Sequence, residues 1–328
     1  MTTFFLTGGS GFVGNRLIGL LRSRGDAVYA LARSDAAAGA VARAGGEPVR
    51  GALEDPAALR DGMRGADVVV HAGARTEDWG RPAEFERVNV EGTKNVLWAM
   101  ERAGVARIVH VTPATVLADG HPVVGADETA PLPARPLGWY HRSKRDAELA
   151  VLAAERLEAI VVRPALVWGP GDTTWLPRFR EGVRTGRFRW VGSGRHRVST
   201  THVANAAHGL ALAADRGRAG DVYFVTDGAP VEFRRFASRY LRAIGLTVPD
   251  RTISPRGARL TASAGEGFWS MLAAKRPPPV TRAMFAVIGA ECTVNDAKAR
   301  SELGYEPLVP YEAGMQELER RRRNRVPN

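Results

Sequence analysis

Short apolar runs alternate with longer segments of mixed polarity along the first half of the chain. A short apolar run is typical of a buried strand, and the longer mixed segments are typical of helices. We predict strands at 4–6, 27–32, 48–53, 68–74, 107–111 and 222–225, and helices at 15–24, 55–63, 84–103 and 145–155. Strands that alternate with helices indicate a parallel, doubly wound sheet. The predicted fold class is therefore α/β, with a Rossmann-type sheet and a smaller C-terminal substrate-binding subdomain.

The alternation loosens after residue 170, and we place a domain boundary there. Residues 1–170 are predicted to form a nucleotide-binding domain, to which 198–226 return. Residues 171–197 and 227–312 are predicted to form the substrate-binding subdomain that caps it. Residues 313–328 form a basic C-terminal tail, whose arginines we expect to be solvated and frayed.

Three glycines lie three residues apart between the first predicted strand and the first predicted helix. This spacing is a tighter relative of the dinucleotide fingerprint. Glycine there lets backbone N–H groups approach a pyrophosphate, and the helix N-terminus adds partial positive charge. A plain structural turn is the alternative, but the position between a strand and a helix favours a dinucleotide site. The predicted phosphate-binding residues are Gly8, Ser10, Gly11, Phe12, Val13 and Gly14.

Arg33 and Ser34 follow the second predicted strand, where an acidic residue would hold the ribose 2′-hydroxyl of NAD. A guanidinium and a hydroxyl suit a 2′-phosphate instead. We therefore predict NADP as the cofactor, with NAD as the alternative. The other interpretation is that Arg33 is an ordinary surface arginine with no role in cofactor binding.

Tyr140 and Lys144 are four residues apart at the start of a segment rich in helix formers, so they are expected to share one helical face. A phenol with its ordinary pKa of about 10 is a poor acid–base group near neutrality. A neighbouring ammonium stabilises the phenolate and lowers that pKa. The pair is therefore predicted to exchange a proton with a substrate oxygen while a nicotinamide carries hydride.

The chain as a whole resembles an extended short-chain dehydrogenase/reductase. The matching segments are 7–14, 71–74, 89–93, 163–172 and the pair Tyr140 and Lys144. Within that family the chain is most similar to the 3β-hydroxysteroid and sterol-4-carboxylate dehydrogenase branch, on segments 168–172, 279–282 and 298–305.

The resemblance implies further residues of the cofactor site. They are Leu53, Ala72, Gly73, Ala74, Asn89, Pro164, Ala165 and Val167. Tyr140 and Lys144 are predicted to contact the cofactor as well, with Lys144 holding the nicotinamide ribose. The resemblance also implies a homodimer that pairs through the helices bearing Asn89 and Tyr140.

Two positions depart from the family pattern. The family places a serine or threonine before the catalytic tyrosine, but that position is Pro113 here, and proline has no donor. Thr112 and Thr115 are the candidates to replace it, although Thr112 should point away from the site. Ala52 replaces an aspartate that touches the adenine in relatives, and Leu53 can still pack there. The first departure weakens the expectation of efficient redox catalysis.

Composition and charge bear on whether the chain binds nucleic acid, forms a disulfide, spans a membrane or holds a metal. The net charge of +11 comes from arginine spread along the whole chain, which argues against a nucleic-acid-binding face. The single cysteine, Cys292, excludes an internal disulfide, and no apolar run reaches the length of a membrane helix. We therefore expect a cytoplasmic location. The histidines lack metal-ligand spacing, so no metal is predicted.

Tryptophans are numerous near the expected substrate-binding part. Each one alone is explained by ordinary packing, but together they suggest an aromatic-lined, apolar pocket. The predicted substrate residues are Trp79, Trp139, Trp168 and Trp175.

The leading functional hypothesis is an NADP-dependent oxidoreductase that interconverts a secondary alcohol and a ketone on an apolar small molecule. Such a molecule would be similar to a sterol, a polyketide or another secondary metabolite. A nucleotide-sugar epimerase or dehydratase is one alternative, and it requires Arg178, Arg195 and Arg197 to converge on one face. A cofactor-binding protein with weak turnover is the other, because Pro113 removes a donor.

Overall fold

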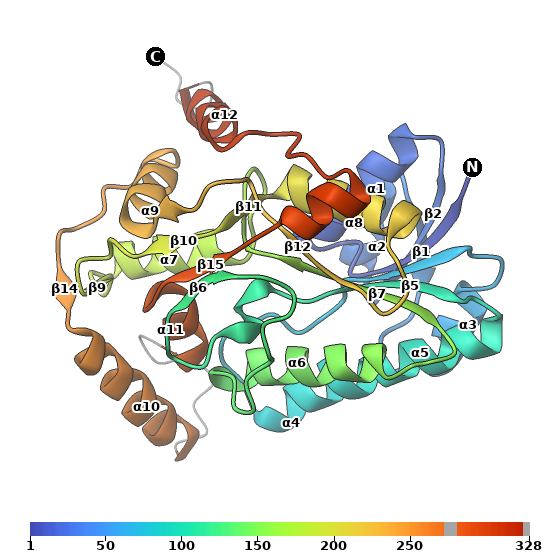
Figure 1. Cartoon of the computed structure of the whole chain (residues 1–328), viewed down its shortest axis with the longest axis horizontal. Coiled ribbons are helices and arrows are strands. Elements are labelled where there is room, and N and C mark those ends of the chain that lie inside the picture. Colours follow the sequence, from blue (N-terminus) through green and yellow to red (C-terminus); the bar gives the residue numbers. More distant parts are fainter. Residues whose placement is uncertain (272–280, 324–328) are drawn as a thin grey trace.

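The computed structural model describes residues 1–271 and 281–323, and its centre is a seven-stranded parallel sheet (Figure 1). The strand order is β12-β7-β5-β4-β1-β2-β3. The strands are β1 (Thr3–Thr7), β2 (Ala27–Ala32), β3 (Glu47–Arg50), β4 (Val68–His71), β5 (Arg107–Val111), β7 (Glu158–Pro164) and β12 (Val222–Val225). The predicted α/β fold class is confirmed.

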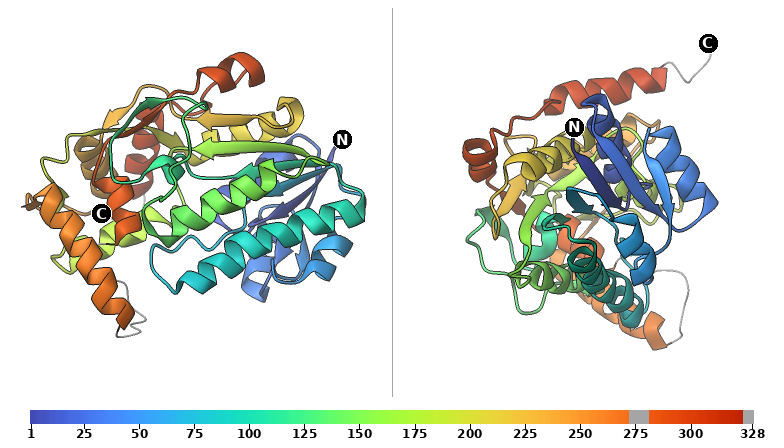
Figure 2. Two further views of the ribbon diagram at one scale, coloured as in Figure 1. Left: turned by 60° about the horizontal axis from the view of Figure 1, so that its bottom comes forward. Right: turned by 90° about the vertical axis from the view of Figure 1, so that its right-hand side faces the viewer.

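Helices cover both faces of this sheet (Figures 1 and 2), because successive side chains of a buried strand point to opposite faces. Phe4 of β1 packs with Leu17 and Leu210 on one face, and Phe5 packs with Val96 on the other. The first face carries α1 (Phe12–Ser23), α2 (Asp35–Arg43) and α8 (Val203–Arg216); the second carries α3 (Pro56–Gly62), α5 (Gly92–Ala103) and α6 (Gly138–Leu152).

Most predicted boundaries agree with the structure to within about one residue, and β2, β5 and β12 agree at both ends. The strand predicted at 48–53 ends at Arg50, because Gly51 has a φ of +153° that leaves the strand conformation. The helix predicted at 15–24 begins earlier, with Gly11 as its N-cap.

The helix predicted at 84–103 contains an irregular turn. It consists of α4 (Pro82–Phe85), a π-helical segment (Glu86–Glu91) and α5. Asn89 lies in the π-helical segment, and such segments are frequent at functional sites.

A second hydrophobic cluster lies in the C-terminal part, and aromatic side chains such as Phe179, Trp190 and Phe236 fill it. Its helices are α7 (Trp175–Arg184), α9 (Phe233–Arg242), α10 (Pro255–Met271), α11 (Arg282–Ile288) and α12 (Tyr311–Arg323). The remaining strands form three small sheets, in the orders β13-β10-β15-β6, β11-β8 and β14-β9. They are β6 (Val123–Ala126), β8 (Leu166–Trp168), β9 (Trp190–Val191), β10 (Arg197–Val198), β11 (Thr200–His202), β13 (Val231–Glu232), β14 (Thr252–Ile253) and β15 (Cys292–Val294).

Most of the predicted C-terminal tail is helical rather than frayed. Met315 and Leu318 of α12 pack into the aromatic cluster, and Arg239 of α9 donates to Glu312 and Glu319 on the same helix. The prediction treated residues 313–328 as one basic tail, although the apolar Met315 and Leu318 precede the arginine run. Residues 324–328, with Arg325 of the arginine run, lie outside the described residues.

Candidate active site

A cavity of about 840 Å³ opens at the carboxyl ends of β1, β4 and β5. In a doubly wound sheet this is where ligands bind, because the order of the strands reverses there. The volume lies within the usual range of small-molecule sites, roughly 300–1,000 Å³. Its lining includes Gly8, Ser10, Gly11, Phe12, Val13, Gly14, Arg33, Leu53, Ala72, Gly73, Ala74, Trp79, Pro113, Thr115, Tyr140, Lys144, Pro164, Ala165, Val167 and Trp175.

The glycine turn has the geometry that a pyrophosphate requires. Gly8 has a φ of +74°, and its carbonyl accepts from the N–H of Gly11 at 2.9 Å. A Cβ on Gly14 would lie only 2.2 Å from the Gly8 oxygen, so the turn closes tightly on α1. No side chain caps α1, and its first turn holds no acidic residue. The free N–H groups there therefore suit an anionic group.

Arg33 and Ser34 differ in how they can serve the cofactor. The exposed Arg33 lines the cavity. The Ser34 hydroxyl accepts from the N–H of Ala37 at 3.2 Å and so caps α2. Ser34 is not part of the cavity lining, and this cap explains its position.

The loop after β4 is held in place by two buried side chains. Thr7 Oγ1 accepts from the N–H of Gly73 at 3.0 Å. The Asn89 amide accepts from the N–H of Arg75 at 2.7 Å and donates to the Arg75 carbonyl and to Ser143. Asn89 is 1 % exposed and outside the cavity lining, so its side chain positions the loop and α6.

Tyr140 and Lys144 lie on consecutive turns of α6, and both line the cavity. Burial raises the pKa of Tyr140, which is opposite to the direction expected from a neighbouring ammonium. Burial lowers the pKa of Lys144 to about 8, although the charge of Glu148 opposes this. Both groups therefore hold their protons at neutral pH.

A buried polar network lies behind Lys144, and the sequence analysis assigned it no role. Lys144 Nζ is 3.3 Å from His110 Nε2, and the ring of His110 is 5.1 Å from that of His71. His71 bonds Thr7 and Thr93. Burial and the charge of Lys144 lower the pKa of His71 to about 3, so this ring is neutral. No sequence pattern marks this contact, because His110 on β5 and Lys144 on α6 lie 34 residues apart.

The two threonine candidates are placed differently. Thr112, which directly follows β5, is fully buried outside the cavity lining, as expected for a side chain that points away from the site, and no described residue bonds its hydroxyl. Thr115 follows Pro113 in a short 3-10 turn and lines the cavity. Its hydroxyl bonds His141 Nε2 at 3.0 Å.

The four predicted substrate tryptophans separate into two groups. Trp79 and Trp175 line the cavity. Trp168 is 0 % exposed, packs edge-on against Phe236 and donates to Asp227 at 2.6 Å, so it belongs to the aromatic core. Trp139 is 43 % exposed on α6 and packs against the side chain of Arg142. The structure therefore corrects the interpretation of Trp168 and Trp139 as cavity residues.

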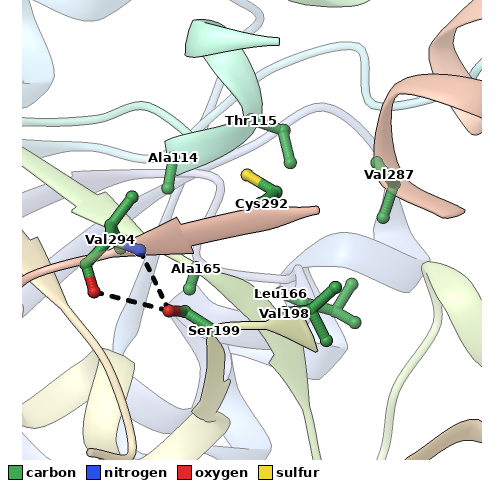
Figure 3. A pocket seen from close by; sticks show the side chains of 9 residues that line it. All are labelled: Ala114, Thr115, Ala165, Leu166, Val198, Ser199, Val287, Cys292 and Val294. Carbon is green, nitrogen blue, oxygen red and sulfur yellow. Dashed lines mark hydrogen bonds between the residues drawn. The ribbon is translucent and has the colours of Figure 1, made fainter. Parts of the chain in front are cut away.

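A small apolar pocket of about 10 Å³ adjoins the main cavity (Figure 3). Thr115, Ala165 and Leu166 line both spaces, whereas Cys292 and Val287 line the small pocket only. Burial raises the pKa of the Cys292 thiol to about 12, so the thiol is neutral. This extension has room for one methyl-sized group.

Within residues 1–271 and 281–323, no group of three His, Cys, Asp or Glu side chains could hold a metal ion. None of the helices in this part of the chain combines the length and apolarity needed to cross a bilayer.

Comparison with known proteins relates this site to a family. Residues 5–256 match the model of the 3-beta hydroxysteroid dehydrogenase/isomerase family. The chain is 45% identical over 316 residues to 4-hydroxy-2-methyl-3-oxo-4-farnesyl-3,4-dihydroquinoline-1-oxide ketoreductase of Stigmatella aurantiaca, covering 96% of this chain and 95% of that protein. It is 30% identical to the decarboxylating sterol-4-alpha-carboxylate 3-dehydrogenase of Dictyostelium discoideum, covering 97% of this chain and 100% of that one.

A solved structure shares the fold. It is a double mutant of the dTDP-glucose 4,6-dehydratase of Streptomyces venezuelae with NAD bound, with a TM-score of 0.76, 23% identity, and coverage of 98% of this chain and 97% of that one. The resemblance inferred from the sequence motifs is confirmed, although residues 279 and 280 of those motifs lie outside the described residues. The chain belongs to the 3-beta hydroxysteroid dehydrogenase/isomerase family of extended short-chain dehydrogenases/reductases and is an NAD(P)-dependent oxidoreductase.

Proposed function

We propose that this protein is an NADP-dependent ketoreductase that converts a ketone on an apolar small molecule to a secondary alcohol. One observation carries the proposal: Tyr140 and Lys144 open into the same cavity as the uncapped start of α1 and Arg33. The ketoreductase of Stigmatella aurantiaca supports it, since its named substrate carries an oxo group and a farnesyl chain.

The protonation states favour reduction. A neutral phenol at Tyr140 can donate its proton to the carbonyl oxygen of a substrate. Lys144 is mostly protonated at neutral pH, and its charge stabilises the phenolate that remains. When bound, a reduced nicotinamide supplies hydride to the carbonyl carbon. Gly8, Gly11 and the first N–H groups of α1 would hold its pyrophosphate.

The test is consumption of NADPH, followed by its absorbance, with a panel of apolar ketones. Turnover of at least one ketone, saturable in ketone, is the expected result. Absence of turnover together with tight NADPH binding would instead favour the cofactor-binding alternative.

The nucleotide-sugar alternative requires three arginines to gather at the cavity, and their contacts do not favour this. Arg178 lines the cavity, but its guanidinium pairs with Asp78 at 2.6 Å. Arg197 donates to the Pro230 carbonyl, and neither Arg197 nor Arg195 belongs to the cavity lining. The three arginines therefore do not converge on a diphosphate. The nucleotide-sugar enzymes among the solved structures share the fold alone.

Two further properties are part of the proposal. A homodimer through α5 and α6, which lie side by side in Figure 2, is supported by large apolar side chains that are exposed on these two helices, namely Trp98, Trp139 and Leu149. A cytoplasmic location is supported by the single buried cysteine, which needs no oxidising compartment.

Cofactor preference is expected to depend on Arg33. Arg33→Asp removes a charged donor and adds repulsion toward a 2′-phosphate, so the KM for NADPH should rise about 10- to 100-fold while that for NADH falls. Initial rates with both cofactors measure this. Arg43→Asp, the same charge change at an exposed residue outside the cavity lining, is the control. Equal KM changes in both variants would contradict a specific role.

Restoring the missing donor is expected to raise activity on simple ketones. Pro113 has φ −69° and ψ 143°, a conformation that serine adopts without strain. Pro113→Ser should keep the fold and raise kcat by about tenfold or more, since one such donor contributes a few kcal/mol at oxyanion-type sites. Steady-state kinetics and thermal unfolding check both parts. Unchanged or lower activity would show that another group already fills this role.

A further inference from the structure

The hydrogen bonds around His141 fix the direction in which the Thr115 hydroxyl points its proton. His141 Nδ1 is 2.7 Å from the carbonyl oxygen of Leu137, and a carbonyl only accepts, so Nδ1 carries the hydrogen. Burial lowers the pKa of His141 to about 4, so the ring is neutral at pH 7. Nε2 therefore has a lone pair, and the Thr115 hydroxyl must donate to it at 3.0 Å.

This assignment changes what Thr115 offers to a ligand. Its only proton is used by His141, while its oxygen keeps acceptor capacity. Within the part of the chain that the structure describes, no protein donor reaches this oxygen. Thr115 lines the same cavity as Pro113 and Tyr140, and His141, which holds its proton, directly follows Tyr140 on α6. An acceptor therefore lies two residues after the position where the family expects a donor, in the cavity of the proposed proton donor.

We propose that Thr115, with its proton held by His141, is a subsite for a hydroxyl or N–H group on the substrate, next to the carbonyl that Tyr140 protonates. The substrate class is then an apolar ketone with a neighbouring hydrogen-bond donor, such as an α-hydroxyketone. Thr115 accepts from that donor, and His141 is a positioning residue that acts through Thr115. This inference rests on the proposed function of the same cavity.

Three ketones with one skeleton test the subsite: benzoin, its methyl ether and deoxybenzoin. They carry a hydroxyl, a methoxy group and a hydrogen at the same position. The wild-type protein with NADPH should show a kcat/KM for benzoin about three- to tenfold above that for deoxybenzoin, the usual contribution of one neutral hydrogen bond. The methyl ether, which lacks the donor, should not exceed deoxybenzoin.

Matched variants test whether the preference for benzoin over deoxybenzoin depends on Thr115 and His141. Thr115→Val should lower kcat/KM for benzoin about three- to tenfold more than for deoxybenzoin, which brings the ratio near one. His141→Leu frees the Thr115 proton and should also lower the ratio. His141→Gln should restore it, because an amide can donate to Leu137 and accept from Thr115. Thr112→Val, the same change outside the cavity lining, should leave the ratio unaltered. Thermal unfolding of each variant reports whether it folds.

Calorimetric binding of the three ketones to the NADP-loaded protein separates this inference from the proposed function. Turnover without preference for benzoin, or a preference that persists in Thr115→Val, overturns the subsite and leaves the reductase intact. Preferential binding of benzoin without turnover overturns the reductase and supports the subsite. Neither turnover nor binding overturns both.

Discussion

Replacing Tyr140 by phenylalanine is expected to lower kcat for ketone reduction about 10²- to 10⁴-fold, the usual contribution of a general acid. The substitution removes only the hydroxyl, so the ring keeps its contact with His141, whose centroid is 5.2 Å away. The raised pKa keeps the Tyr140 phenol protonated at neutral pH. Deprotonation of Tyr140 should therefore not lower the wild-type kcat there. Steady-state and single-turnover rates with NADPH measure the loss.

Cofactor binding distinguishes this result from misfolding. The Kd for NADPH, measured by fluorescence titration, should change little in Tyr140→Phe, since the glycine turn and Arg33 are untouched. Tyr29→Phe, the same change at a residue 37 % exposed and outside the cavity lining, is the matched control and should keep full activity. Turnover that survives Tyr140→Phe would remove the proposed mechanism even if the protein reduces ketones by another route.

The strand predictions succeeded where burial alone decides the structure. Residues 27–32 are an apolar run, residues 107–111 contain Ile108, Val109 and Val111, and the two segments are β2 and β5 in the structure. A central strand of a parallel sheet is mostly apolar because helices cover both faces, so its position is visible in the sequence. The glycine turn was predictable for a related reason, because the close approach of Gly14 to Gly8 tolerates no side chain.

Contacts between distant segments were not predictable in the same way. His110 bonds Lys144 across 34 residues of chain, and His141 bonds Thr115 across 26. Neither pair has a characteristic spacing, because its geometry depends on how α6 packs against the sheet. The sequence therefore suggested Thr115 as a replacement donor, whereas the structure commits its proton to His141.

The burial of the tryptophan side chains was likewise not predictable from local sequence. Trp168 is the last residue of β8 and Trp175 the first residue of α7, so both are near the cavity in the sequence. The side chain of Trp168 is buried by Phe236 and Tyr240, which arrive from α9 about 70 residues later. Whether an aromatic side chain enters a cavity or a core depends on such partners, which local sequence does not identify.

Replacing Lys144 by methionine is expected to abolish most activity and yet stabilise the fold. Lys144 is 3 % exposed, and burial lowers its pKa from 10.5 to about 8. The difference corresponds to roughly 3 kcal/mol of folding free energy that the buried charge costs at pH 7. Methionine fills the same space without a charge. The lost bond to His110 offsets about 1 kcal/mol, so a net gain of roughly 1–2 kcal/mol remains.

The pH dependence identifies the cause of this gain. Below pH 8 both folded and unfolded Lys144 are protonated, and the full cost is present. Between about pH 8 and 10.5 only the unfolded chain keeps the proton, so wild-type stability rises with pH and the advantage of Lys144→Met shrinks. Thermal unfolding of both proteins at pH 7 and pH 9.5 (roughly the middle of that window) measures it. Lys94→Met, at a half-exposed lysine, is the control.

A lower melting temperature for Lys144→Met at pH 7 would mean that His110 and Glu148 stabilise the buried ammonium by more than its desolvation costs. Lys144 would then be a structural cation, and the loss of activity in Lys144→Met would no longer be evidence for its charge beside the Tyr140 phenolate.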